Sequence, residues 1–75
     1  MSPTSLRTAG TSDQRLIARL AALDSKAAPR GHVLLAEVEG DIPAALELET
    51  GTVYANPFRR TAHLVALLEL HAKAA

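Results

Sequence analysis

The 75-residue sequence contains no cysteine, which excludes disulfides and thiolate metal sites. This absence matters because a chain so short buries only about 60% of the surface that it exposes when unfolded. Domains of this size commonly gain stability from a disulfide, a bound metal or oligomerisation. The composition favours the last of these, so we expect self-association, in the simplest case a homodimer.

Aromatic residues make up only 3% of the chain, although apolar residues make up 48%. Alanine and leucine supply most of the apolar fraction, so we expect neither a large ligand cavity nor a cofactor. Apolar runs such as Val33–Ala36 and Leu64–Leu68 are far shorter than the roughly 20 residues that cross a membrane. Residues 1–5 lack the basic and apolar regions of a signal peptide. We therefore expect a cytoplasmic protein with no membrane partner.

Neither sign of charge is in excess, because eight basic residues balance eight acidic ones. A nucleic-acid partner is not expected, since both a net basic balance and interleaved aromatic residues are missing. The charges are nevertheless unevenly placed. Residues 1–30 carry five basic and two acidic side chains, whereas residues 31–50 carry five acidic side chains and no basic one. This distribution favours packing between the segments, within one chain or across an oligomer; a solvated surface is the alternative.

A helix is predicted from Thr11, because Thr11 and Gln14 have the spacing of a capping box. Apolar residues recur at helical spacing as far as Leu23, and the pattern ends near Asp24-Ser25. A loop over residues 26–31 follows.

The segment before this helix is short. Residues 5–9 fit either an edge strand or a frayed tail, and residues 1–4 are expected to be disordered. The whole chain, residues 1–75, is expected to form one small domain.

After the loop the apolar period changes to two, which predicts strands over residues 32–38 and 42–49. Gly40 can supply the positive φ that a tight hairpin needs. A three-residue loop would then set Val38 opposite Ile42.

A two-residue Thr50-Gly51 turn leads to a further strand over residues 53–56. This register places the following apolar residues on one core face: Leu34, Ala36, Val38, Ile42, Ala44, Leu46, Leu48, Val53 and Ala55. A final helix begins near Thr61, and its apolar residues cover an arc broad enough for part of it to face a second subunit: Leu64, Val65, Leu67, Leu68 and Leu70.

The predicted fold class is α+β, an antiparallel meander of three to four strands packed against two helices. The element order is β-α-β-β-β-α, and we expect dimerisation to complete the fold. The second face of the meander mixes apolar residues with Glu37 and Glu47. On that face we predict the contact surface between subunits, formed by Val33, Leu35, Ala45 and Tyr54.

The element order and residues 33–45 resemble the N-terminal half of the GNAT family of N-acetyltransferases. In that family, two apolar strands flank an acidic residue and a glycine, as Glu39-Gly40 does here. The stretch Ser5–Ala9 with the helix that follows is similar to the opening strand and helix of the family. Asn56-Pro57-Phe58-Arg59 lies where the family often has a proline, an aromatic residue and an arginine. The resemblance implies a truncated, degenerate relative that retains only the first half of the fold.

The run Arg59–Leu64 lies where the family has a glycine-rich loop around the pyrophosphate of coenzyme A. Ala62 and Leu64 stand where that loop has glycines, and their Cβ atoms would obstruct the approach of phosphate to the backbone. The resemblance, which covers only the first half of the fold, implies that the strands that complete the cofactor cleft would be absent and that no catalytic residue can be carried over. A weak anion site remains a candidate at Arg59, Arg60 and Thr61. The alternative, which we favour, is that Thr61 caps the helix and the arginines are solvated or pair with the acidic hairpin.

Three histidines, His32, His63 and His71, are the only imidazoles. His63 and His71 are two helical turns apart, too far for the i, i+4 pairing of a single metal ion, so no metal site is expected.

The sequence thus leaves two hypotheses for function. The first is a non-enzymatic, homodimerising protein-interaction module. The second is an acyl-CoA-binding or nucleotide-binding remnant of an N-acetyltransferase, with a weak site or one formed between subunits. Acetyltransferase activity is not expected in either case.

Overall fold

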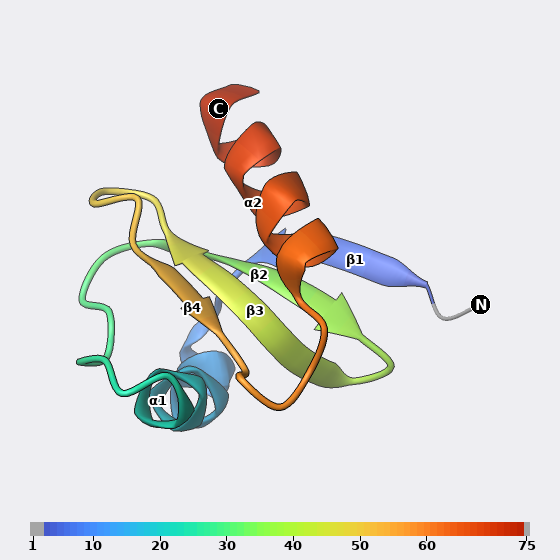
Figure 1. Ribbon diagram of the computed structural model, residues 1–75. Helices are drawn as coiled ribbons and strands as arrows, with labels where there is room; N and C mark the ends of the chain where they lie inside the picture. The colour runs from blue at the N-terminus through green and yellow to red at the C-terminus, as the bar shows by residue number, and fades with distance from the viewer. Residues whose placement is uncertain (1–2, 75) are drawn as a thin grey trace.

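The computed structural model describes residues 3–74. Its elements are β1 (Thr4–Thr8), a 3-10 turn (Thr11–Asp13), α1 (Gln14–Leu23), β2 (Val33–Val38), β3 (Asp41–Glu47), β4 (Val53–Ala55) and α2 (Ala62–Ala74). The strands form one antiparallel sheet in the order β1-β2-β3-β4, so β1 and β4 are its edges (Figure 1). This architecture confirms the predicted α+β class and element order.

The N-terminal segment is an edge strand rather than a frayed tail. In the antiparallel pairing with β2, Thr4 lies opposite Val38 and Thr8 opposite Leu34. The expectation of disorder for residues 1–4 is therefore wrong at Thr4; Met1 and Ser2 lie outside the described residues.

Asp13, not Thr11, organises the start of α1. Its carboxylate accepts a hydrogen bond of 2.8 Å from the backbone N–H of Gly10, and its own N–H donates to the Gly10 carbonyl. The predicted pairing of Thr11 with Gln14 is replaced by this reciprocal pair. An acidic side chain three residues after a glycine cap thus satisfies donors that would otherwise be free at the helix start. The helix ends at Leu23, as predicted.

The turn between β2 and β3 contains two residues, one fewer than predicted. Glu39 and Gly40 have φ values of 53° and 80°, and Val38 lies opposite Asp41. Two successive residues with positive φ match the twist of a hairpin, which explains why the shorter turn is adopted. The predicted pairing of Val38 with Ile42 is therefore wrong.

A bulge in β3 shifts the register of its pairing with β2 next to this turn. Ala36 lies opposite Ala44, so Ile42 and Pro43 together oppose the single residue Glu37. Proline has no N–H to donate and is accommodated in sheets at such bulges. Because of the extra residue, Ile42 joins the residues beneath α1 instead of the face on which Ala44 lies.

The connection from β3 to β4 is also longer than the predicted Thr50-Gly51 turn. Leu46 pairs with Val53, and residues 48–52 connect the two strands. The N–H of Gly51 donates to the carbonyl of Glu47 at 2.8 Å. This hydrogen bond closes a five-residue turn that a two-residue hairpin could not contain.

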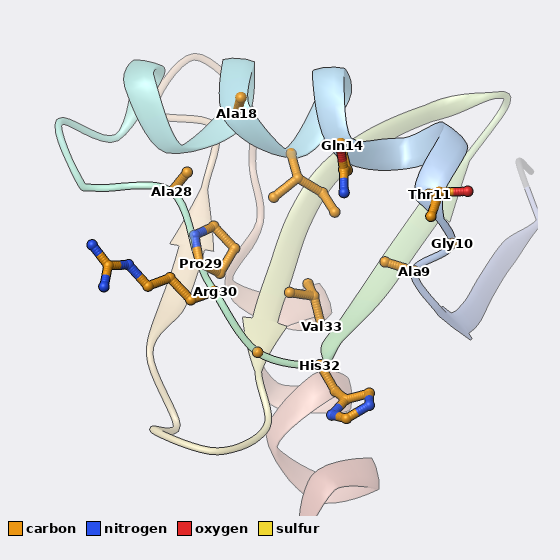
Figure 2. Close-up of a pocket in the computed structure, with 12 residues that line it drawn as sticks. Ala9, Gly10, Thr11, Gln14, Ala18, Ala28, Pro29, Arg30, His32 and Val33 are labelled. Atoms are coloured by element: carbon orange, nitrogen blue, oxygen red, sulfur yellow. The ribbon is translucent and has the colours of Figure 1, made fainter.

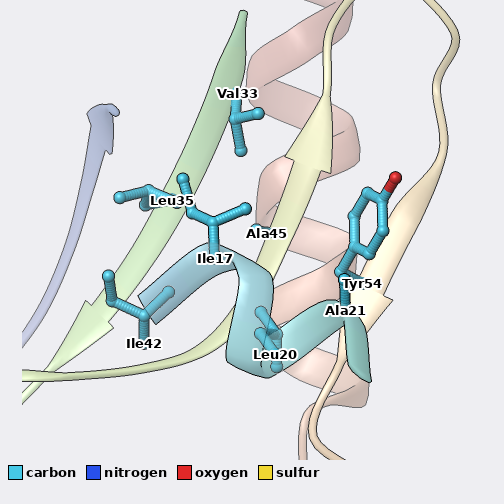
Figure 3. Packing of buried hydrophobic residues seen from close by; sticks show 8 residues of the cluster. All are labelled: Ile17, Leu20, Ala21, Val33, Leu35, Ile42, Ala45 and Tyr54. Carbon is cyan, nitrogen blue, oxygen red and sulfur yellow. The ribbon is translucent and has the colours of Figure 1, made fainter. Parts of the chain in front are cut away.

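Both faces of the sheet are buried, because the two helices lie on opposite sides (Figure 3). On one face, Ile17, Leu20 and Ala21 of α1 pack on the sheet. The sheet residues in this cluster include the whole predicted contact surface, with exposed fractions of 4% for Val33, 0% for Leu35, 0% for Ala45 and 3% for Tyr54. The prediction that these four residues meet a second subunit is wrong, since α1 covers them within the same chain.

The other face of the sheet packs against α2. Leu64 and Leu68, one helical turn apart, contact a cluster formed by Leu34, Ala36, Ala44 and Leu46. Leu67 and Leu70 remain 42% and 67% exposed, so only a narrow stripe of the helix is buried. That the exposed part of this arc faces a second subunit stays a prediction.

Candidate functional site

The anion site suggested at the start of α2 is already engaged in contacts within the chain. Arg59 Nη1 donates to Asp41 Oδ2 at 2.6 Å, which ties the arginine to the acidic hairpin. The carbonyl of Thr61 accepts from the N–H of Val65, as at a helix N-terminus. Leu64 is 2% exposed and lies in the core, so a glycine loop cannot form there without removing a core side chain. Arg60 is exposed.

Charged side chains form a network on the face of β1 that α1 covers. Arg7 donates from both terminal nitrogens to the carboxylate of Asp13, at 2.8 and 2.9 Å, and from Nε to Glu37 at 2.8 Å. Asp13 is 6% exposed. The bidentate hydrogen bonds of Arg7, together with the Gly10 N–H, lower the pKa of Asp13 from 3.8 to about 2. This network fixes β1 against β2 and against the start of α1.

The hydrogen-bond pattern of β1 determines which of its backbone groups face away from the sheet. The N–H of Ala9 donates to the carbonyl of Val33, directly across the ladder. Antiparallel pairs alternate between bonded and non-bonded positions, so Arg7 and Ser5 also point their backbone groups toward β2. The N–H and C=O groups of Thr4, Leu6 and Thr8 therefore point outward. We call these six groups the open edge, because no other residue within 3–74 forms a hydrogen bond with them.

The opposite edge of the sheet is covered. In β4 the bonded positions pair Tyr54 with Ala45, so Val53 and Ala55 point outward. Asp24 Oδ2 accepts from the N–H of Ala55 at 3.1 Å, and Lys26 Nζ donates to the carbonyl of Val53.

The side chains of Asp24 and Lys26 also form an ion pair of 3.2 Å. Lys26 Nζ lies 5.7 Å from the centre of the Tyr54 ring, whose hydroxyl donates to the Ala27 carbonyl. The segment after α1 thus occupies the positions along β4 that a neighbouring strand would take.

Two carboxylates at the end of β3 hold the loop before β2. Glu47 accepts from the N–H groups of Arg30 and Gly31, and Glu49 accepts from the N–H and Nδ1 of His32. Hydrogen bonding to His32 lowers the pKa of Glu49. Glu47, predicted to lie on the same face as the contact surface, is a largely buried acceptor for backbone N–H groups.

A half-open cleft of about 450 Å³ lies between this loop and α1 (Figure 2). This volume is within the range of ligand pockets and exceeds what the low aromatic content led us to expect. Ile17, Val33 and Pro29 form much of its apolar wall. The Gln14 side chain extends toward the loop, whereas Arg30 points away from the cleft (Figure 2). No set of charged side chains converges in it.

Within residues 3–74 no three acidic or histidine side chains lie close enough together to hold a metal ion. In the same part of the chain, none of the helices has both the length and the apolar character needed to span a membrane. Comparison with protein families, with curated proteins and with solved structures finds no match. The resemblance to N-acetyltransferases therefore stays a prediction.

Sequence reasoning missed the residues that distinguish the two sheet edges. Asp24 and Lys26 are ordinary polar residues of a post-helix turn, and only their contacts with β4 give them a role. The open edge consists of backbone groups, which no residue pattern specifies. The alternation of Ser5–Ala9 could indicate a strand, but not which of its sides would be unpaired.

Proposed function

We propose that this chain is a non-enzymatic protein-interaction module that acts as a homodimer, with the open edge of β1 as its contact site. The observation that supports this proposal is the difference between the two edges of one sheet. The side chains of Asp24 and Lys26 bond the outward backbone groups of β4, whereas the outward groups of Thr4, Leu6 and Thr8 leave β1 free to add a strand. Addition of a strand to such an edge is a common mode of recognition.

The composition of β1 supports the same conclusion. Exposed edge strands are usually protected by lysines, by prolines, or by charged side chains that point inward. The one charged residue of β1 is Arg7, and Asp13 and Glu37 hold its side chain on the α1 side of the sheet. Arg7 is itself an inward-pointing charge of this protective kind, but its ion pairs with Asp13 and Glu37 neutralise it, and β1 carries neither lysine nor proline.

An acyl-CoA or nucleotide site receives less support from the same structure. Arg59 already pairs with Asp41, and Leu64 fills the core where a phosphate loop would need glycine. The cleft beside α1 lies on the other side of the sheet from the buried face of α2, so the two features do not form one site.

A test of strand addition is to remove one outward N–H without changing the ladder to β2. Thr8→Pro does this, because the Thr8 N–H faces away from the sheet and proline is tolerated at such edge positions. Thr8→Val is the matched control, since it removes the hydroxyl and keeps the N–H. We expect the wild type and Thr8→Val to be dimers, and Thr8→Pro to be a monomer with the same far-UV circular dichroism.

The measurement is molar mass by sedimentation equilibrium at protein concentrations up to about 1 mM, which detects even weak dimers. A wild-type chain that stays monomeric throughout this range would overturn the proposal. So would a folded Thr8→Pro variant that dimerises as strongly as Thr8→Val.

A further inference from the structure

We infer that the partner strand at the open edge is β1 of a second copy, antiparallel, with Leu6 opposite Leu6 of that copy on the two-fold axis. This inference rests on the proposed function and specifies its register. Two four-stranded sheets would join into one continuous sheet, with a β1 strand from each chain at its centre.

The outward hydrogen-bonding groups of β1 match those of a second, antiparallel β1 strand. Thr4, Leu6 and Thr8 point outward and are evenly spaced about Leu6. In the Leu6-centred register Thr4 of each chain faces Thr8 of the other, so all three outward residues lie in bonded positions. Each of these pairs exchanges two hydrogen bonds, and the open edge of each copy is fully used.

The neighbouring registers are less favourable. A two-fold axis at Arg7 would place the two Arg7 side chains directly opposite each other, and like charges in such a pair are destabilising. An axis at Ser5 would place Thr4 opposite Leu6 and leave Thr8 without a partner among residues 4–8. With the axis at Leu6, Arg7 faces the uncharged Ser5 of the other copy and keeps its ion pairs with Asp13 and Glu37.

The side chains on the face covered by α2 also favour the Leu6-centred register. Leu6 lies opposite Ala36 and packs, only partly buried, against the cluster beneath α2. Directly opposite residues on an antiparallel ladder have Cβ atoms about 5 Å apart. A second Leu6 at that position would cover apolar surface that one copy alone leaves exposed. The flanking pairs would be Thr4 with Thr8, and threonines form favourable cross-strand pairs.

The register can be tested with charges at Thr4 and Thr8, which are both exposed. In the proposed register, Thr4→Lys combined with Thr8→Lys places lysine opposite lysine twice. Thr4→Lys combined with Thr8→Glu places lysine opposite glutamate twice. We expect the lysine–lysine variant to dimerise at least about tenfold more weakly than the lysine–glutamate variant, given the usual size of cross-strand charge effects.

The control variant combines Gln14→Lys with Ala66→Lys and therefore adds the same charge as the lysine–lysine variant, but away from the open edge. Both positions are exposed, on α1 and α2 respectively. Its dimer dissociation constant, measured by sedimentation, should stay within about threefold of the wild-type value. Circular dichroism at low concentration checks that every variant folds.

Each outcome decides a different point. A weaker lysine–lysine dimer beside an intact lysine–glutamate dimer supports the register. Equal affinities for these two variants overturn the register but leave the homodimer of the proposed function in place. A wild-type chain that is monomeric in the same experiment overturns the proposed function itself.

Discussion

At the scale of single residues, Asp13 connects more of the fold than any feature of its sequence context suggests. Its carboxylate accepts from Arg7 on β1 and from the N–H of Gly10, while Arg7 also reaches Glu37 on β2. Three consecutive elements therefore depend on one ionised side chain that is almost entirely buried.

This network predicts a loss of stability in acid. The folded-state pKa of Asp13 is about 2, below its ordinary value of 3.8. The contribution of this carboxylate to the free energy of unfolding is therefore complete at pH values above 3.8 and is lost as the pH falls toward 2. We expect Asp13→Asn to lower the free energy of unfolding at neutral pH and to reduce its dependence on pH between these values. Urea unfolding at a series of pH values measures both effects.

Glu69→Gln is the control, because Glu69 is exposed on α2 and its substitution should leave the pH profile unchanged. The pKa of Glu49 is also lowered, so some dependence on pH should remain in Asp13→Asn. A profile for Asp13→Asn that is identical to the wild-type profile would contradict the role assigned to this carboxylate.

At the scale of elements, the face that each segment buries depends on details of register. The bulge at Ile42 and Pro43 moves Ile42 beneath α1, and the two-residue turn at Glu39 and Gly40 sets where the bulge must occur. In α2 the buried stripe consists mainly of Leu64 and Leu68, although the helix carries leucine on other sides as well.

Two leucines of α2 should therefore respond very differently to truncation. Leu68 is fully buried, and Leu68→Ala should lower the free energy of unfolding by about 2–5 kcal/mol through lost burial and the cavity left behind. Leu70 is 67% exposed, and Leu70→Ala should change the stability of the monomer by less than about 0.5 kcal/mol. Chemical denaturation at low protein concentration compares the two variants, and similar losses would contradict the orientation of α2.

At the scale of the whole molecule, residues 3–74 cover one edge of the sheet and leave the other edge open. This difference limits assembly by strand addition to two copies, because each chain offers a single free edge. The same argument explains how a module with an unpaired strand can avoid growing into longer sheets.

Uncovering β4 should remove this limit. Asp24→Ala combined with Lys26→Ala deletes the side chains that bond the backbone of Ala55 and Val53. With both edges free, we expect concentration-dependent species larger than a dimer, visible by sedimentation velocity and suppressed by adding Thr8→Pro. Arg19→Ala, an exposed substitution on α1, should leave the wild-type mass unchanged. A double variant that shows the same mass as the wild type would contradict the protective role of Asp24 and Lys26.

The fold was largely predictable, whereas the candidate site was not. Periods of 3.6 and two residues located both helices and three of the strands, because these periods reflect local backbone geometry. Val33, Leu35, Ala45 and Tyr54, predicted to form a contact surface, lie in the core beneath α1, since periodicity shows that two faces differ and does not show what covers each of them. Arg59, Arg60 and Thr61 were correctly located before a helix, but the contact of Arg59 with Asp41 depends on chain segments 18 residues apart.

Composition and local periodicity are sufficient to predict the α+β class, the order of the elements and the absence of a disulfide. Three properties became visible in the folded chain: α1 and α2 cover opposite faces, Asp24 and Lys26 bond one edge of the sheet, and the backbone groups of Thr4, Leu6 and Thr8 point away from the other edge. These properties depend on register and on contacts between distant segments. A shift of one residue reverses which side chains and backbone groups face outward.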